Sequence, residues 1–273
     1  MSMYDILSEI TERQITKTEM GDSRIYGVVR GIVAKNYDQD MPGRVCITIP
    51  TRDDAANELQ WARLAMPSSG PTYGHYFLPE VGDQVLVIFE GGQIEKPYII
   101  GCVPKDNSTF VSKVVDEKNR YKKIATRRGT AITFDDSPDS EDGSKDKLIL
   151  TTANDMLQVM LDNENQTILL TDKKKANKIE LITTEGSESC EIKVRGMLTI
   201  NVGDNITVSM NGESGAVSIS SGDFTVNASN SASIKTDSSI KFESGQITEN
   251  ASASHKISSS GMVSIGGSPI KIG

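Results

Sequence analysis

Short apolar runs separated by turn-forming residues fill the chain up to about residue 104. Runs of β-branched and aromatic residues bounded by Gly, Pro and Asp are typical of β-strands. The clearest pair is 84–90 and 97–100, which Gly91-Gly92 joins as an antiparallel hairpin. Further strands are predicted at 25–36, 43–50 and 61–65, with a tight turn at 79–83 and a polar loop at 51–60. The pattern predicts a β-barrel of five or six strands that closes near Gly101.

After a polar, charged connector at 105–124, a second apolar pattern begins at Ala125. Short strands broken by Asp, Asn and Gly are predicted at 130–136, 146–152, 156–162, 166–172 and 178–184. They define a proximal β-stalk over 125–196. The acidic run 135–146 invites a calcium interpretation, but it lacks the spacing of an EF-hand loop. We therefore expect a solvated hairpin loop there.

From Met197 to residue 273 the chain carries a repeat of two apolar residues placed two apart. The pairs are Leu198/Ile200, Ile206/Val208, Val217/Ile219, Phe224/Val226, Ala232/Ile234, Ile240/Phe242 and Val263/Ile265, with Ile247 and His255/Ile257 filling the interval. Most steps are seven or eight residues, and the longer step across 211–215 is expected to form an outward turn. Each repeat is predicted to be one strand with a single buried face.

A ribbon of such repeats cannot bury its own apolar face. Two apolar side chains contribute ~1.5–3 kcal/mol each when buried, against ~1–2 kcal/mol per residue for ordering a backbone of about eight residues. Three chains wound about one axis cover the face and pair the strand edges. A single-chain β-helix is the alternative, but its rungs need about twenty residues. The period favours an intertwined trimeric needle over 197–273.

Four segments of the barrel region carry a resemblance to a known family. GRVCITIP, WARLAMPSSG, YGHYFLPEVGDQVLVIFEGG and KPYIIG resemble the OB-fold barrel of contractile-tail spikes: phage baseplate assembly protein V, VgrG and related injection particles. The resemblance is close over residues 24–104 and looser over the rest of the chain. Its motif positions, expected to be structural, are Gly43, Arg44, Trp61, Gly74, Pro79, Gly82, Asp83, Gly91, Gly92, Pro97 and Tyr98.

The resemblance implies an all-β homotrimer, an OB-fold barrel followed by an intertwined β-helical or β-prism needle. It implies the central spike of a baseplate, driven into a target envelope by sheath contraction. About twenty residues precede the barrel, so the large hub of VgrG proteins is expected to be a separate protein. A helix predicted within 4–17 either docks onto a baseplate neighbour or is a frayed terminus.

The resemblance also implies a conical PAAR-type tip protein. The chain ends on MVSIGGSPIKIG, where Ile265, Ile270 and Ile272 are expected to form the platform for that tip, because bare strand edges need a cover.

Catalysis finds little support in the sequence. Some members of the family insert a lysozyme domain between barrel and stalk, but the connector here has about twenty residues, fewer than the ~40 that a domain needs. His75 is expected to be structural, and no G-x-S-x-G elbow supports a Ser-His-Asp site. Three copies of His255 on a threefold axis are a minority interpretation as a metal site. We expect no enzyme activity, cofactor or resident metal.

Charge and composition bear on the remaining classes of function. A net charge of −8 opposes nucleic-acid binding, so Trp61 is expected in the barrel core rather than as a stacking platform for bases. Cys46, Cys102 and Cys190 are expected to be small buried residues of a protein made in the cytoplasm. The chain shows no secretory signal and no run of 18 apolar residues.

Two rival functions belong to other classes. An OB-fold nucleic-acid-binding protein requires a basic groove. A trimeric tailspike or receptor-binding protein requires carboxylates and aromatics on its β-helix, where this needle has only Phe224 and Phe242 as aromatics.

Overall fold

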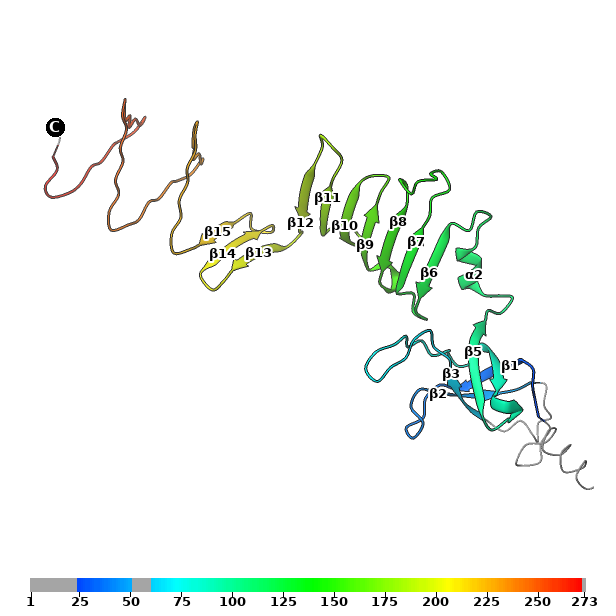
Figure 1. Cartoon of the computed structure of the whole chain (residues 1–273). Coiled ribbons are helices and arrows are strands. Elements are labelled where there is room, and N and C mark those ends of the chain that lie inside the picture. The colour runs from blue at the N-terminus through cyan, green and yellow to red at the C-terminus, as the bar shows by residue number, and fades with distance from the viewer. Residues whose placement is uncertain (1–23, 51–59, 272–273) are drawn as a thin grey trace, which may run out of the picture. The chain divides into compact units, whose positions relative to one another are not determined.

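A computed structural model of the chain describes residues 24–50 and 60–271. It contains a β-barrel, a seven-stranded sheet, a three-stranded sheet and a C-terminal segment (Figure 1). The helix predicted within 4–17, most of the loop predicted at 51–60, and Ile272 lie outside the described residues.

The N-terminal barrel is closed and has five strands in the order β1-β2-β3-β5-β4. They are β1 (Val29–Lys35), β2 (Arg44–Thr48), β3 (Gln60–Leu64), β4 (Gln84–Phe89) and β5 (Pro97–Val103). β4 and β5 form the predicted antiparallel hairpin, whereas β3 and β5 pair in parallel to close the barrel. The predicted five- or six-stranded barrel is thus confirmed with five strands.

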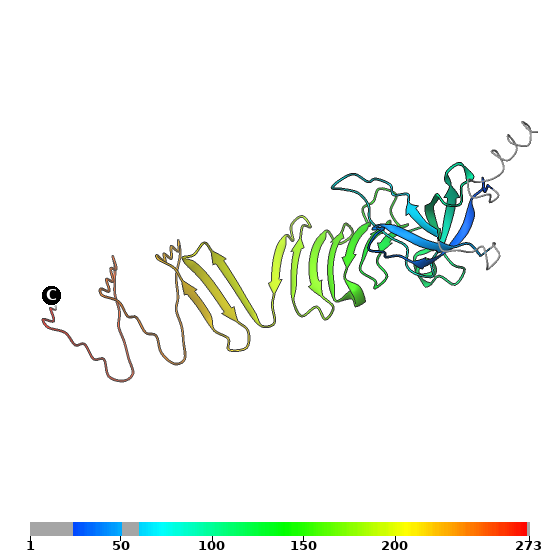
Figure 2. The ribbon, with the colours of Figure 1, turned by 90° about the horizontal axis from the view of Figure 1, so that it is seen from below.

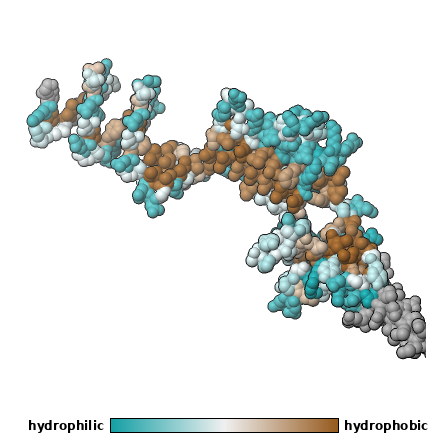
Figure 3. Space-filling model, in the orientation of Figure 1, coloured by the Kyte–Doolittle hydropathy of each residue, from teal (hydrophilic) through white to brown (hydrophobic). Residues whose placement is uncertain are grey.

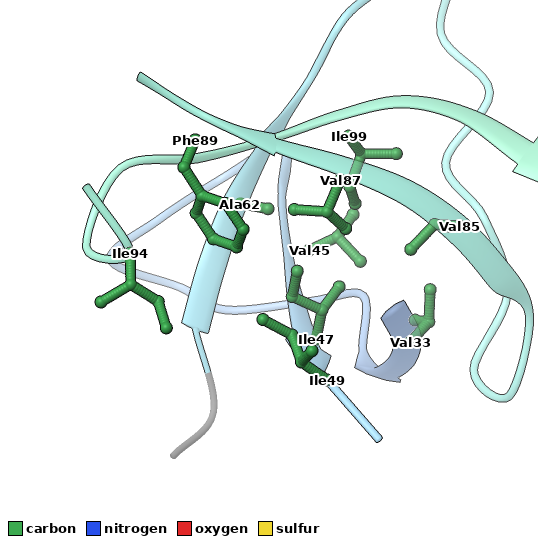
Figure 4. Close-up of a cluster of buried hydrophobic side chains, with 10 residues drawn as sticks. All are labelled: Val33, Val45, Ile47, Ile49, Ala62, Val85, Val87, Phe89, Ile94 and Ile99. Atoms are coloured by element: carbon green, nitrogen blue, oxygen red, sulfur yellow. The ribbon is translucent and has the colours of Figure 1, made fainter. Parts of the chain in front are cut away.

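Successive side chains of each strand point alternately into and out of the barrel, and the inward-pointing apolar side chains fill its interior (Figure 4). The core consists of Val33, Val45, Ile47, Ile49, Ala62, Val85, Val87, Phe89, Ile94 and Ile99. Because Ala62 points inward, its neighbour Trp61 points outward and is only half-buried. The expectation that Trp61 belongs to the core is therefore wrong. Of the three cysteines only Cys46 is buried, whereas Cys102 and Cys190 are exposed in the single chain. The prediction that all three are buried is therefore wrong for Cys102 and Cys190.

Two turns hold the β4–β5 hairpin in place. In the predicted turn at 79–83, the Asp83 carboxylate accepts a hydrogen bond of 2.9 Å from the Glu80 amide, and Gly82 adopts φ of 90°. After β4 the chain turns through a 3-10 helix, η2 (Glu90–Gly92), in which Gly91 and Gly92 have φ of 58° and 75°. Positive φ explains the glycines at these positions.

Replacing Gly92 is expected to destabilise the barrel more than replacing Gly43. Both have positive φ, which costs a residue with a Cβ about 1–2 kcal/mol. A Cβ at Gly43 meets nothing within 4 Å, whereas one at Gly92 lies 3.0 Å from the Arg24 Cβ and 3.3 Å from the Ile25 nitrogen. Gly92→Ala is expected to lose about 1 kcal/mol more than Gly43→Ala. Urea unfolding followed by Trp61 fluorescence measures both, and equal losses contradict the steric argument.

The connector contains a short helix that the sequence analysis did not predict, α2 (Thr109–Val114). The Ser108 hydroxyl accepts a hydrogen bond from the Val111 amide and caps it. Arg120 then forms a two-pronged ion pair with the buried carboxylate of Asp135. This pair lies at the start of the next sheet, whose first strand was not predicted and begins at Tyr121, inside the segment assigned to the connector.

The second part of the fold is an antiparallel meander of seven strands, side by side in chain order (Figures 1 and 2). They are β6 (Tyr121–Ala125), β7 (Ala131–Asp135), β8 (Lys147–Thr151), β9 (Leu157–Asp162), β10 (Thr167–Asp172), β11 (Lys178–Ile182) and β12 (Ser189–Lys193). The five predicted strands are confirmed as β7 to β11. Residues 136–146 join β7 to its antiparallel neighbour β8, which confirms the hairpin loop. A second 3-10 turn, η3 (Ala153–Asp155), links β8 to β9.

The first three apolar pairs of the repeat lie in strands of a three-stranded sheet. These strands are β13 (Met197–Val202), β14 (Ile206–Asn211) and β15 (Val217–Ser220), in the order β13-β14-β15. The predicted turn at 211–215 is confirmed, and the Asn211 amide donates to the Ala216 carbonyl at 2.8 Å. The described residues after Ser220 contain no helix or strand within the single chain.

Candidate functional site

The candidate functional site is one face of the seven-stranded sheet, on which apolar side chains are aligned. The strand register aligns apolar residues in two rows on this face, which we call the apolar stripe. The first row is Ile124, Ile132, Leu150, Val159, Leu170, Ile179 and Ile192, and the second is Phe134, Leu148, Leu161, Ile168, Leu181 and Cys190. The first row crosses all seven strands, and the second runs from β7 to β12 because its position in β6 is Lys122.

Most of the apolar stripe is open to solvent in the single chain. Ile124 at one end is 52% exposed, Leu170 in the middle 43% and Ile192 at the other end 49%. The stripe is the brown band along one side of strands β6–β12 in Figure 3. A monomeric protein rarely exposes an apolar patch larger than a few hundred Å² without a partner. The stripe therefore has the character of an assembly surface.

The opposite face of the sheet is mostly polar and is crossed by ion pairs. Lys147 lies 3.0 Å from the buried carboxylate of Asp162 and 3.2 Å from Glu164. Lys178 bridges Glu180 and Glu191, at 2.7 Å from each. A central row of Ile149, Met160 and Leu169 is half-buried among these groups. An antiparallel sheet with one wet face and one apolar face needs a cover only on the apolar side.

The Asp162 carboxylate is the buried polar group on the wet face. Burial raises the pKa of Asp162, but hydrogen bonds from Asn165 and Lys147 outweigh that effect and leave the pKa below its ordinary value. A carboxyl whose pKa is lower in the folded chain stabilises the fold fully above about pH 4. That stabilisation is lost as the pH falls through the lowered pKa.

Asp162→Asn is expected to lower the free energy of unfolding by about 1–3 kcal/mol at pH 7, because Lys147 and Asn165 lose a charged acceptor. The difference from the unmodified chain is expected to stay constant between pH 7 and about 5 and to shrink below about pH 4. Urea unfolding at a series of pH values measures it. Glu164→Gln, at a side chain 47% exposed, is the control and is expected to change little. A pH-independent difference contradicts the assignment.

The C-terminal segment presents the remaining apolar pairs to solvent. Phe224 is 68% exposed, Ile240 49% and Ile265 67%. In the described part of this segment the backbone forms no strand pairs. The amides of Ser238, Gln246 and Gly261 donate only to nearby serine or threonine hydroxyls. The expected platform residues Ile265 and Ile270 are likewise exposed.

The two histidines lie in simple local contacts. His75 Nδ1 is 3.0 Å from the Ser68 hydroxyl at the base of an exposed hairpin, and in the described chain no carboxylate pairs with His75. His255 Nε2 is 3.0 Å from Glu249. No group of three metal-ligating side chains occurs within residues 24–50 and 60–271.

Other family-motif positions serve the barrel turns or its outer face. The Tyr98 hydroxyl donates to the Glu90 carboxylate at 2.9 Å, and Pro97 begins β5 and is buried. Gly74 lies in the exposed hairpin, where the Cβ of any larger residue would lie only 2.8 Å from the Ser68 carbonyl oxygen. Arg44 lines a pocket on the barrel surface beside Trp61, together with Arg63, which sequence reasoning missed. The outward position of Arg63 could have been predicted from its neighbour Ala62, since alternation places the small apolar residue inside the barrel.

A comparison with protein families agrees with the barrel. Residues 29–103 match the family described as the type VI secretion system/phage-baseplate injector OB domain. The barrel is an OB domain. The match supports a structural role in a phage or type VI secretion baseplate, and incorporation in a phage tail or tail-like particle. A search of curated proteins found no match to the chain. No helix among the described residues is long and apolar enough to cross a membrane.

Proposed function

We propose that the protein is the homotrimeric central spike of a contractile injection machine. The observation that carries the proposal is the apolar stripe, which crosses all seven strands of the sheet and is exposed in one chain. The OB domain gives the baseplate context. The proposed role is mechanical: sheath contraction drives the spike into a target envelope.

Association of three copies of the chain is the simplest way to cover the apolar stripe. Three amphipathic sheets with their stripes turned to a common axis form a closed apolar prism, and the ion-paired faces stay in water. Residues 221–271 fit the same arrangement, since extended chains winding about one axis pair each other's backbone groups and leave no free edge. A closed, hydrogen-bonded prism resists bending under the load of contraction.

The rival functions have less support from the site. Nucleic-acid binding is disfavoured by the net charge of −8. A tailspike enzyme or glycan receptor is disfavoured because Phe224 and Phe242 are the only aromatic residues after Phe134. The proposed spike is not an enzyme.

The proposed partners are a separate hub protein and a PAAR-type tip. Ile265, Ile270 and Ile272 are the proposed platform for the tip. Removing residues 268–273 is expected to abolish tip binding while leaving the chain's oligomeric state unchanged. Tip binding by the truncated chain overturns this part of the proposal.

Electron microscopy of tail-like particles tests the function. Antibody against this chain is expected to label the baseplate end of the particles, and cells lacking the chain are expected to yield no particles with that label. Labelling along the sheath, or no labelling of particles that contain the chain, contradicts the proposed role.

A further inference from the structure

The outer face of the barrel carries a second site, formed where β2, β3 and β5 lie side by side. Val45, Ala62 and Ile99 point into the core, so the strand residues on either side of Ala62, and those before Val45 and Ile99, point outward. The register places Arg44 opposite Arg63 and Arg63 opposite Tyr98. These side chains line a pocket of about 250 Å³, which we call the barrel pocket, together with Trp61, Glu90, Glu95, Lys96 and Pro97.

The two arginines of the barrel pocket form no ion pair with another described residue. Arg44 and Arg63 are direct cross-strand partners, and within residues 24–50 and 60–271 neither guanidinium makes a hydrogen bond or ion pair. Like charges directly opposite each other on neighbouring strands destabilise a sheet. An anion between them relieves that repulsion and can accept several N–H bonds at once.

A third group in the barrel pocket also lacks a partner. The Glu95 Oε1 atom is buried and accepts no hydrogen bond from any residue that the structure describes. A buried acceptor without a donor is costly. By contrast, Glu90 is already bound by the Tyr98 hydroxyl at 2.9 Å. The pocket therefore presents the cations Arg44, Arg63 and Lys96 for a carboxylate, and one acceptor for an N–H group. A peptide with an acidic side chain offers both a carboxylate and an N–H group.

The charges of the pocket distinguish between anions. Glu90 and Glu95 repel a dianionic phosphate or a polyanion more than a single carboxylate, and the chain as a whole carries −8. We propose that the barrel pocket binds an aspartate or glutamate side chain in an acidic segment of a separate baseplate protein. The identity of the partner as a baseplate protein rests on the proposed function; the carboxylate chemistry rests on the pocket alone.

The single tryptophan of the chain makes this testable directly, because Trp61 lines the pocket. A short, end-blocked peptide of alternating glutamate and glycine is titrated into the full chain while Trp61 fluorescence is followed. A saturable change is expected. The double variant Arg44→Gln/Arg63→Gln is expected to weaken binding at least about tenfold, the loss that follows from removing charge-assisted bonds. Arg30→Gln, at an exposed residue of β1 outside the pocket, is the matched control and is expected to bind normally.

Other results overturn the proposal. Tighter binding of oligothymidylate than of the peptide assigns the pocket to nucleic acid, and equal binding of inorganic phosphate makes it a general anion site. A fluorescence change that follows the chain's own concentration assigns it to a second copy. No response to the peptide in a chain with unchanged circular dichroism excludes a carboxylate site. These outcomes do not depend on oligomeric mass, so a failure here is distinct from a failure of the proposed spike.

Discussion

Leu150→Lys is expected to convert the proposed trimer into monomers. Leu150 lies in the first row of the apolar stripe between Ile132 and Val159, and it is 39% exposed in the single chain. In three copies arranged about an axis, the change places three ammonium groups inside an apolar prism. Burying each unpaired charge costs several kcal/mol in practice, and three such charges oppose assembly of the trimer. Light scattering of the purified variant measures the outcome.

Thr151→Lys is the control for that substitution. Thr151 is the next residue along β8, and its register partners Ala131 and Gln158 place it on the opposite face of the sheet. The same charge there is expected to remain in water and to leave the trimer intact. A Leu150→Lys variant that keeps the mass of the unmodified chain contradicts the assignment of the stripe to the interface. Equal dissociation by both variants points instead to general destabilisation of the sheet.

Backbone amides between residues 224 and 265 are expected to exchange slowly with deuterium. The single chain gives these residues no strand pairing, so their protection can come only from other copies. If the segment pairs within a trimer, exchange is expected to slow on the order of 10³-fold relative to an unstructured chain, the effect of about 4 kcal/mol of opening free energy. Mass spectrometry of peptides from this segment reads the rates.

The Leu150→Lys variant supplies the comparison for exchange. Its C-terminal peptides are expected to exchange at unstructured rates, while barrel peptides containing Val45 and Val87 stay protected in both proteins, because the barrel core is complete in one chain. Rapid exchange of residues 224–265 in the unmodified protein contradicts an intertwined needle.

Alternation and turn residues explain how much of the fold could be predicted. Strands β7 to β11 each carry apolar residues at every second position, and turn residues lie between them. Gly82, Gly91 and Gly92 adopt the positive φ that their turns require. The barrel likewise follows from its apolar runs. These elements can therefore be predicted from the local pattern of apolar and turn residues.

The missed elements lack that local pattern. β6 and β12 are the edge strands of the sheet, and edge strands carry charged residues such as Lys122 and Lys193. The six-residue helix α2 is too short to show a helical period and depends on its cap. Trp61 was misplaced because the prediction weighed only a core position against a stacking platform for bases. The period of two already puts its neighbour Ala62 inside and Trp61 outside.

The candidate site was predictable only in part. The repeat at 197–273 indicated that one chain cannot cover its apolar face, but the two rows of the stripe emerge only from the register of seven strands. Register is a non-local property, set by pairing between strands. Exposure of Cys190 follows from it too, since its partner Leu181 lies in the stripe.

The mass of the purified chain in solution, measured by light scattering across a range of concentrations, tests the central claim most directly. A homotrimer predicts three times the chain mass of 29.6 kDa, stable on dilution and under mild denaturation. A single species of 29.6 kDa, folded and with its stripe uncovered, contradicts the trimeric spike.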